Sequence, residues 1–348
     1  MRLHTAIAAL VVIGIGLGLA APAHVSGTER VLTVCYWKCD FRRIQDAINA
    51  AFDDETVLIK SPGLYDEKLT ITKSIKLVGD ENALPIVLLF MEAFSGPLIS
   101  IGEEEKPIKV TLKNLSLLGW PGQAGVVVKG PTILVLENVE VRRYSSDVGV
   151  GIYIYEQAQV TIKNSIFREN GPSAISSSGQ VVVEDSQIFE NGGGISIYEN
   201  GQLHLIRSSV FNNTLLGIYV DSTGNVLIED SHIYNNRSTG VFLGGSSKVL
   251  IKNSYIYGNR TVGIGIGDSS NVEFLRTTIN QNGTHGLLLT GQPKLVVRES
   301  FIYQNGRWGL TAVLRKCGFN EDLYKGGTID VDESNVIIQN RGGDICLP

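Results

Sequence analysis

The chain has 348 residues, of which 30 are basic and 35 acidic, and its formal net charge at pH 7 is −5. This mildly acidic balance excludes a protein that binds nucleic acid through a broad basic face. The 39 glycines, two methionines and 7% aromatic residues favour many short strands and tight turns over a helical bundle.

The first 23 residues have the pattern of a secretory signal. Arg2 supplies a positive charge, residues 6–20 are apolar, and Ala21-Pro22-Ala23 provides small residues for cleavage. An uncleaved membrane anchor is the alternative, although the apolar run is short for a membrane span. No later stretch of the sequence is apolar enough to cross a bilayer. We therefore expect a mature chain of residues 24–348 that is secreted, periplasmic or at the cell surface.

Export places the four cysteines in an oxidising compartment, where cysteine pairs normally form disulfides. Cys35 and Cys39 are close enough in sequence to suggest a chemical site. Zinc would need two more ligands, an iron–sulfur cluster a third nearby cysteine, and the redox motif has two intervening residues rather than three. The remaining interpretation is a local Cys35–Cys39 disulfide.

An amphipathic helix is predicted over residues 40–53, directly after this pair. Asp40 is a good N-cap residue. Helical spacing places five apolar residues on one face, namely Phe41, Ile44, Ile48, Ala51 and Phe52. This face should lie against the start of the fold.

A repeat of 23 residues organises the rest of the chain. Glycine recurs at this interval from Gly194 to Gly309. Asparagine recurs in phase with it, and a serine or threonine stands five residues before each asparagine, at Asn170, Asn191, Asn213, Asn236, Asn259, Asn282 and Asn305. Such self-similarity indicates a solenoid in which each unit packs on its neighbours.

Between these columns, apolar and polar residues alternate with a period of two, as in residues 249–252 and 255–257. Each unit therefore holds three short strands and has no room for a helix. A coil of three strands also supplies the long crossover that parallel pairing needs. We predict an all-β parallel β-helix of ten or eleven coils, with larger excursions at 79–97, 142–149 and 315–327.

Stacked coils bring equivalent side chains together, so the asparagines should form an inward hydrogen-bonded ladder. Opposite charges should meet on the outer faces, as with Glu229 beside Lys252 and Arg276 beside Glu299. An aromatic stack is predicted from Phe189, Phe211, Tyr234, Tyr257 and Tyr303.

Both ends of such a solenoid expose a strand edge and need a cap. The helix at 40–53 is the predicted N-terminal cap, held by the Cys35–Cys39 disulfide. Residues 315–348 are the predicted C-terminal cap, where a Cys317–Cys346 disulfide would pin the last strand. With both edges covered, we expect a monomer.

Two segments carry a resemblance to a known family. Residues 40–79 resemble the opening of right-handed β-helix proteins of the pectin-lyase-like superfamily, and the repeats from Asn164 to Gly309 resemble its carbohydrate-binding and sugar-hydrolase type repeats. The resemblance implies a single right-handed parallel β-helix domain. It implies function only weakly, because the superfamily holds lyases, hydrolases, esterases, epimerases and members without known activity.

Enzymes of this superfamily carry acidic residues, with an arginine or a histidine, on outward-facing strands. Here the outward column after the glycines contains no acid, since it consists of Tyr153, Ser176, Ser196, Tyr219, Phe242, Gly265, Leu288 and Thr311. No acid stacks with His285 or His232, so we interpret both as packing residues. Asp221 and Asp268 are interpreted as turn residues that bond their own backbone. No catalytic residue is predicted.

Calcium is the one cofactor considered, at Asp330, Asp332 and Asn335. Their alternating oxygens resemble part of a calcium loop, but the glycine and distal glutamate of an EF-hand are missing. The alternative is an acid pair on an exposed last strand. No other metal or cofactor is expected.

Exposed aromatic residues on the strands after the glycines are the candidate ligand-binding surface. They are Tyr153, Tyr155, Tyr198, Tyr219 and Phe242, with Arg142, Arg143 and Tyr144 in a loop expected to reach toward them. Aromatic rings on a flat sheet suit stacking against sugars, and the alternative is stacking that only stiffens the sheet. We expect non-catalytic binding of a polysaccharide or cell-surface glycan. A polysaccharide lyase or glycoside hydrolase with a non-standard site is the alternative hypothesis.

Overall fold

The computed structural model describes residues 30–83, 86–89, 96–120, 122–144 and 149–348. The predicted signal sequence at 1–23 lies outside the described residues, as do parts of the excursions at 79–97 and 142–149. Within the described part of the chain, no helix is long and apolar enough to cross a membrane.

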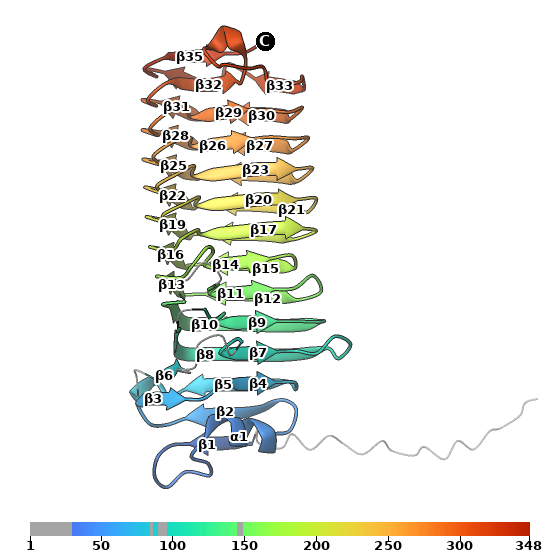
Figure 1. Cartoon of the computed structure of the whole chain (residues 1–348), viewed down its shortest axis with the longest axis vertical. Helices are drawn as coiled ribbons and strands as arrows, with labels where there is room; N and C mark the ends of the chain where they lie inside the picture. Colours follow the sequence, from blue (N-terminus) through green and yellow to red (C-terminus); the bar gives the residue numbers. More distant parts are fainter. Residues whose placement is uncertain (1–29, 84–85, 90–95, 121, 145–148) are drawn as a thin grey trace, which may run out of the picture.

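The chain forms a solenoid with three strand-lined faces, called here the first, second and third sheets (Figure 1). The first sheet consists of β4 (Leu69–Ile71), β7 (Ile99–Ile101), β9 (Val126–Val128), β11 (Ile152–Ile154), β14 (Ile175–Ser177), β17 (Ile195–Glu199), β20 (Ile218–Ser222), β23 (Val241–Gly245), β26 (Ile264–Ile266), β29 (Leu287–Leu289), β32 (Trp308–Ala312) and β35 (Gly343–Cys346).

The second sheet consists of β1 (Val31–Val34), β2 (Glu55–Ile59), β5 (Ile75–Gly79), β8 (Ile108–Leu118), β10 (Thr132–Arg142), β12 (Gln159–Lys163), β15 (Gln180–Glu184), β18 (Gln202–Ile206), β21 (Asn225–Glu229), β24 (Lys248–Lys252), β27 (Asn271–Leu275), β30 (Lys294–Arg298) and β33 (Thr328–Val331). Strands β8 and β10 run on into the third sheet, whose other strands are β3 (Gly63–Asp66), β6 (Ile86–Leu89), β13 (Ile166–Arg168), β16 (Gln187–Phe189), β19 (Ser209–Phe211), β22 (His232–Tyr234), β25 (Tyr255–Tyr257), β28 (Thr278–Asn280), β31 (Phe301–Tyr303) and β34 (Val336–Ile338).

Strands one coil apart pair in parallel and in register, as the 23-residue repeat predicts. In β20 and β23, for example, Tyr219 stands opposite Phe242. The first sheet has twelve strands in the described residues, so the solenoid has about twelve coils rather than the predicted ten or eleven. The count was too low because the coils before residue 150 differ in length, lack the asparagine column and continue the glycine column only at Gly125.

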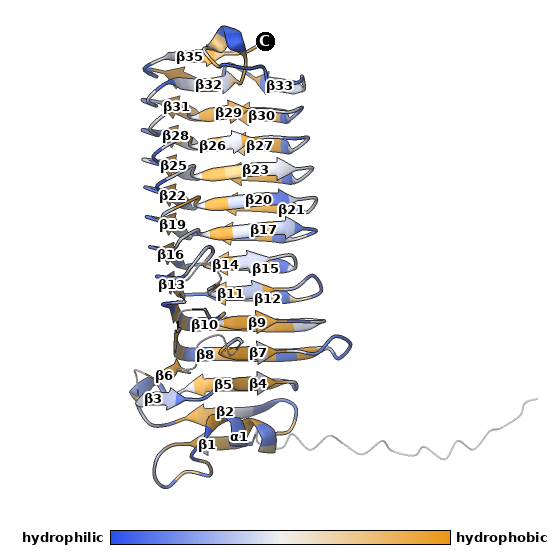
Figure 2. Cartoon of the chain, viewed as in Figure 1, coloured by the Kyte–Doolittle hydropathy of each residue, from blue (hydrophilic) through white to orange (hydrophobic). Residues whose placement is uncertain are grey.

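The core is a continuous apolar interior lined by alternate residues of each strand. In β24, Val249 and Ile251 point inward, and the residues beside them are at least partly exposed. Apolar residues dominate the strands, and hydrophilic residues gather at the turns between them (Figure 2). The repeated glycines are required by close approach, because a Cβ at Gly217 would stand 2.6 Å from the Gly240 carbonyl oxygen.

The asparagine ladder is present. Each amide Nδ2 donates to the Oδ1 of the next coil's asparagine, with 2.9 Å from Asn213 to Asn236 and 3.0 Å from Asn236 to Asn259. The hydroxyl column forms a second ladder, in which the backbone N–H of Ser208 donates to Ser231 Oγ. These ladders satisfy backbone groups that the turns would otherwise bury unpaired.

The helix near the N-terminus is shorter than predicted. It is α1, Ile44–Ala50, which contacts β1, β2 and β4 and buries Ile44, Ala47 and Ile48. The predicted Asp40 N-cap is wrong, because the Asp40 carboxylate accepts hydrogen bonds from the backbone and hydroxyl of Thr33. Phe52 is 71% exposed and does not join the buried face.

A remote acid caps this helix instead. The Glu67 carboxylate accepts hydrogen bonds from the backbone N–H groups of Ile44 and Gln45, at 2.8 and 3.1 Å. It thus satisfies two of the free donors at the helix N-terminus and places negative charge at the positive end of the helix dipole. The contact ties α1 to the loop between β3 and β4.

Both predicted disulfides are confirmed. Cys35 and Cys39 close the loop between β1 and α1, and Cys317 and Cys346 join the short helix η2 (Arg315–Cys317) to β35. One further short helix, η1, spans Glu81–Ala83.

Candidate functional site

A groove of about 640 Å³ lies on the outer face of the first sheet, over β11, β14, β17 and β20. Its walls and floor include Tyr153, Ser173, Ser176, Tyr198, Glu199 and Asp221. Because alternate residues of a strand share a face, Ser176 and Tyr198 both lie on the outer face of the sheet.

The hollow arises from a change of side-chain size along one column. Tyr153, Ser176, Ser196 and Tyr219 are in register on successive coils. Of these residues, Tyr153 and Ser176 line the groove, and the small Ser176 beside the Tyr153 ring leaves the depression. The column continues to Phe242, whose ring stacks on Tyr219 with centroids 5.7 Å apart.

The tyrosines at the groove keep part of their ring faces accessible. Tyr153 and Tyr198 are 38% and 39% exposed. The Tyr153 and Tyr155 rings are tilted by 47°, and the Tyr198 and Tyr219 rings by 51°. All five aromatic residues predicted for this surface therefore lie on it, in two groups on either side of the serines.

The aromatic stack on the third sheet differs in geometry. From Phe189 through Phe211 and Tyr234 to Tyr257, the rings lie 4.8–4.9 Å apart and within 12° of parallel. Each ring face is covered by the next ring, so only edges remain for a ligand. This stack stiffens its sheet.

Two carboxylates of the groove are close to its tyrosines. The Tyr219 hydroxyl donates to Asp221 Oδ2 at 3.4 Å, and burial together with the Asp221 carboxylate raises the pKa of Tyr219. Burial, with the nearby Tyr155, Tyr198 and Glu199, likewise raises the pKa of Tyr153. Both phenols are therefore neutral hydrogen-bond donors at physiological pH.

The interpretation of Asp221 and Asp268 as residues that bond their own turns is wrong. Asp221 meets the Tyr219 ring hydroxyl, and Asp268 Oδ2 accepts a hydrogen bond from the backbone N–H of Gly245 on the preceding coil. Both carboxylates are exposed on the face that carries the groove.

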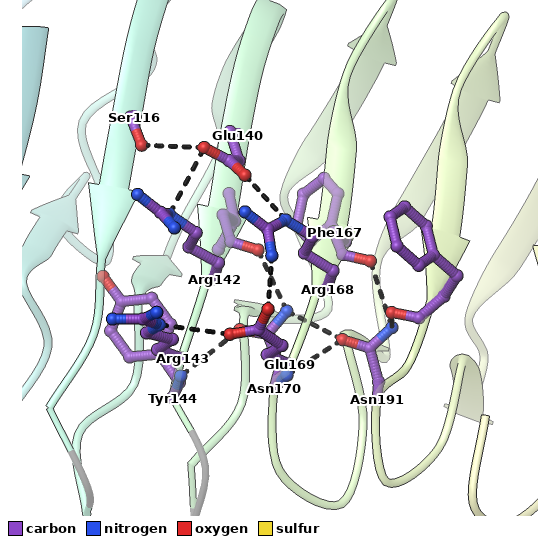
Figure 3. Close-up of polar contacts among 12 residues, drawn as sticks. Ser116, Glu140, Arg142, Arg143, Tyr144, Phe167, Arg168, Glu169, Asn170 and Asn191 are labelled. Carbon is purple, nitrogen blue, oxygen red and sulfur yellow. Dashed lines mark hydrogen bonds and ion pairs between the residues drawn. The ribbon is translucent and has the colours of Figure 1, made fainter. Parts of the chain in front are cut away.

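Arg142, Arg143 and Tyr144 are not part of the groove lining. Figure 3 shows Arg142 beside Glu140 and Arg143 beside Glu169. Arg142 ends β10 on the third sheet, where its Nε lies 3.3 Å from Glu140, and Arg143 Nε lies 3.1 Å from Glu169. Tyr144 is fully buried, and burial raises the pKa of its phenol far above the usual range. Its ring occupies space left by the missing side chains of two glycines, Gly119 and Gly125.

The two histidines considered in the sequence are packing residues, as interpreted. His285 lies against Phe319 and accepts a hydrogen bond from the Trp308 backbone N–H at 3.4 Å. Burial lowers the pKa of His285 to about 4, so it is neutral at pH 7. His232 stacks on Tyr255 with ring centroids 4.9 Å apart.

The residues considered for calcium are held by protein groups. Arg298 pairs with both Asp330 and Asp332, and Asn335 Oδ1 accepts a hydrogen bond from the backbone N–H of Ser300, ending the hydroxyl ladder. Calcium would have to displace Arg298. Across the described ranges, no group of three or more His, Cys, Asp or Glu side chains is arranged to hold a metal.

Sequence reasoning missed a second groove, of about 460 Å³, on the outer face of the second sheet. Its lining includes a column of polar side chains spaced by one coil, Gln180, Gln202, Asn225, Lys248 and Asn271. Sequence reasoning also missed Glu199 and the depression at Ser176, although the period-23 column contained that serine.

The fold can be compared with known proteins. The family model described as right handed beta helix region matches residues 99–215 and 175–341. The A-module of mannuronan C-5 epimerase AlgE4 from Azotobacter vinelandii has a TM-score of 0.64 at 19% identity, covering 88% of this chain and 92% of that chain.

Two further solved structures are similar. The A-module of mannuronan C-5 epimerase AlgE6 from Azotobacter vinelandii has a TM-score of 0.60 at 17% identity, covering 88% of this chain and 94% of that chain. A variant of the periplasmic alginate epimerase AlgG has a TM-score of 0.53 at 14% identity, covering 80% of this chain and 77% of that chain. At these identities the likeness is one of fold. No curated protein matches the sequence. The chain belongs to the right-handed β-helix family.

Proposed function

We propose that the protein is a secreted β-helix that binds a polysaccharide or a cell-surface glycan, without catalysis, in the groove of the first sheet. The observation that carries this proposal is a hollow floored by serines and walled by tyrosines with accessible ring faces. Sugar rings have apolar C–H faces and polar edges, and such a surface offers stacking and hydrogen bonds together.

The ligands named for the fold neighbours support a polysaccharide as the ligand class. The fold neighbours are named for mannuronan and alginate, which are polysaccharides. A solenoid face also suits a polymer, because its features repeat every coil along the axis.

The absence of a basic residue from the described lining of the groove supports binding over catalysis, although Glu199 and Asp221 could transfer a proton. This described lining holds no histidine, lysine or arginine. A lyase or a hydrolase needs a group to take or give a proton and, for many polymers, a cation to stabilise developing negative charge. One contact favours the alternative, a polysaccharide lyase or glycoside hydrolase, since the Tyr219 phenol and Asp221 carboxylate form a donor–acceptor pair.

The remaining features of the chain fit a secreted monomer. We propose that residues 1–23 direct export, that α1 and residues 315–348 protect the strand edges at the two ends, and that the β-helix spans residues 24–348. The two disulfides support an oxidising compartment.

A glycan array followed by calorimetry tests the proposal. We expect Tyr198→Ala to weaken binding of any glycan found by about 2- to 12-fold, the worth of one aromatic contact. The matched control is Tyr255→Ala, an exposed tyrosine on the third sheet, which should bind normally. Assays for new reducing ends and unsaturated products follow on each hit. Turnover would establish the enzyme alternative, and failure to bind any glycan would overturn the proposal.

A further inference from the structure

The described lining of the groove on the first sheet holds two carboxylates, Glu199 and Asp221, and no basic side chain. On the second and third sheets, some outer acids pair with bases on the next coil, as Glu229 does with Lys252 at 2.8 Å and Glu140 with Arg168 at 2.8 Å. Among the described residues, Glu199 and Asp221 line the groove without any ion pair. Asp268, farther along the same face, accepts only a backbone N–H.

The cations nearby do not enter the groove. Lys129 lies 5.6 Å from the centroid of the Tyr155 ring and is not part of the groove lining. Arg142 and Arg143 are held by glutamates on the third sheet. The groove therefore presents negative charge that no described side chain neutralises.

A buried hydroxyl faces the same space. Ser176 lines the groove and is only 6% exposed, and no described residue forms a hydrogen bond with its side chain. Its Oγ remains open to the groove, so a ligand there can form a hydrogen bond with it. The hydroxyl can accept from an N–H or donate to a sugar oxygen.

We propose that the ligand of this groove is a glycan with protonated amino groups, that is, a polymer of amino sugars. Ammonium groups would pair with Glu199 and Asp221, lie against the tyrosine rings by cation–π attraction, and donate to Ser176. This inference rests on the proposed function and names the substrate class of that site.

The same charges disfavour a polyuronate. Each uronate would bring a carboxylate toward Glu199 or Asp221, with no lysine, arginine or histidine in the described lining to offset the repulsion. The fold neighbours are named for mannuronan and alginate, which are uronate polymers, so the groove of this chain selects a different charge class.

Three probes of equal length test this on the full mature chain: β-1,4-linked hexamers of glucosamine, N-acetylglucosamine and mannuronate. In calorimetry at low salt we expect the glucosamine hexamer to bind about tenfold tighter than its N-acetyl counterpart, the effect of two exposed ion pairs. The preference should shrink at high salt, because salt screens exposed charges. The mannuronate hexamer should bind weakest.

Variants separate charge from stacking. The double variant Glu199→Gln with Asp221→Asn should bring the glucosamine and N-acetylglucosamine hexamers to equal affinity, while Tyr198→Ala should weaken both. Glu273→Gln, an exposed acid on the second sheet, is the matched control and should keep the preference.

The outcomes are distinguishable. The amino-sugar inference would be overturned if the glucosamine and N-acetylglucosamine hexamers bound equally well. It would also be overturned if the N-acetylglucosamine or mannuronate hexamer bound more tightly, with or without calcium. Neither result would contradict glycan binding itself. Absence of binding by all three probes and by the array would overturn both. A preference that survives the double variant would place the amine elsewhere on the molecule and also overturn the inference.

Discussion

Replacing Asn236 with alanine should lower the free energy of unfolding by more than the loss of side-chain packing alone would. Asn236 is 1% exposed, and its amide takes part in four hydrogen bonds. Oδ1 accepts from the backbone and the amide of Asn213, and Nδ2 donates to the Val210 carbonyl and to Asn259 Oδ1. The variant leaves the Asn213 backbone N–H buried without its acceptor.

The magnitude follows from these contacts. Four hydrogen bonds at a net value of about 0.5–1.5 kcal/mol each, including one fully orphaned backbone donor, give a loss of about 3–5 kcal/mol. Asn236→Asp has almost the same shape but should cost more than alanine. Its second oxygen would face the Val210 carbonyl and Asn259 Oδ1, so acceptors would oppose acceptors around a buried charge.

Urea unfolding followed by circular dichroism measures the free energy of unfolding and the m-value. Hydrogen exchange at the backbone N–H of Asn213 measures the loss of this hydrogen bond directly, and this N–H should lose its protection before the others in the coil. Arg237→Ala changes an exposed residue of the same turn and should stay within about 0.5 kcal/mol. A loss below about 1 kcal/mol for alanine at an unchanged m-value, or a milder effect for aspartate than for alanine, would refute the ladder reasoning.

Three further predictions concern the C-terminal half. Replacing Cys317 and Cys346 by serine should lower the free energy of unfolding by about 3 kcal/mol in urea, because the bond closes a long loop; an unchanged midpoint would show that the last coil is held without it. Since the pKa of His285 is lowered to about 4, the unfolded chain binds more protons below pH 6.5, and stability should fall from pH 6.5 to pH 4. His285→Asn should flatten that slope, and an equal slope in the variant would assign it to other groups. Added calcium should leave the melting temperature unchanged because Arg298 holds the carboxylate of Asp332; a rise that Asp332→Asn abolishes would instead establish a calcium site there.

The repeat made the fold predictable because its constraints are local in sequence and identical in every coil. An asparagine such as Asn259 bonds its copies one coil away in both directions, so its spacing records the stacking itself. Before residue 150 the coils vary in length, the asparagine column is absent, and the glycine column continues only at Gly125. There the spacing gave no coil count, and one or two coils were missed.

The helix cap and the buried tyrosine were mispredicted for a different reason. Local pattern favoured Asp40 as the cap, but the acid that caps α1 is Glu67, which arrives from the next coil. Tyr144 was predicted to lie in a loop that reaches toward the aromatic surface, yet its ring is buried and fills space above Gly119. Both outcomes depend on contacts between segments that spacing along the chain does not encode.

The groove lies where equivalent positions on neighbouring coils carry neither similar side chains nor opposite charges. Equal positions on neighbouring coils usually hold similar side chains or opposite charges, and the predicted pairs Glu229–Lys252 and Arg276–Glu299 follow this rule. On the first sheet, serines interrupt a column of aromatic rings, and Asp221 stands in register with Tyr198 and Gly244 rather than with a base. Stability alone would favour a neutralised, uniform column. Departures of size and charge that coincide in one hollow are therefore best explained by a ligand that supplies the missing ring faces and the missing positive charge.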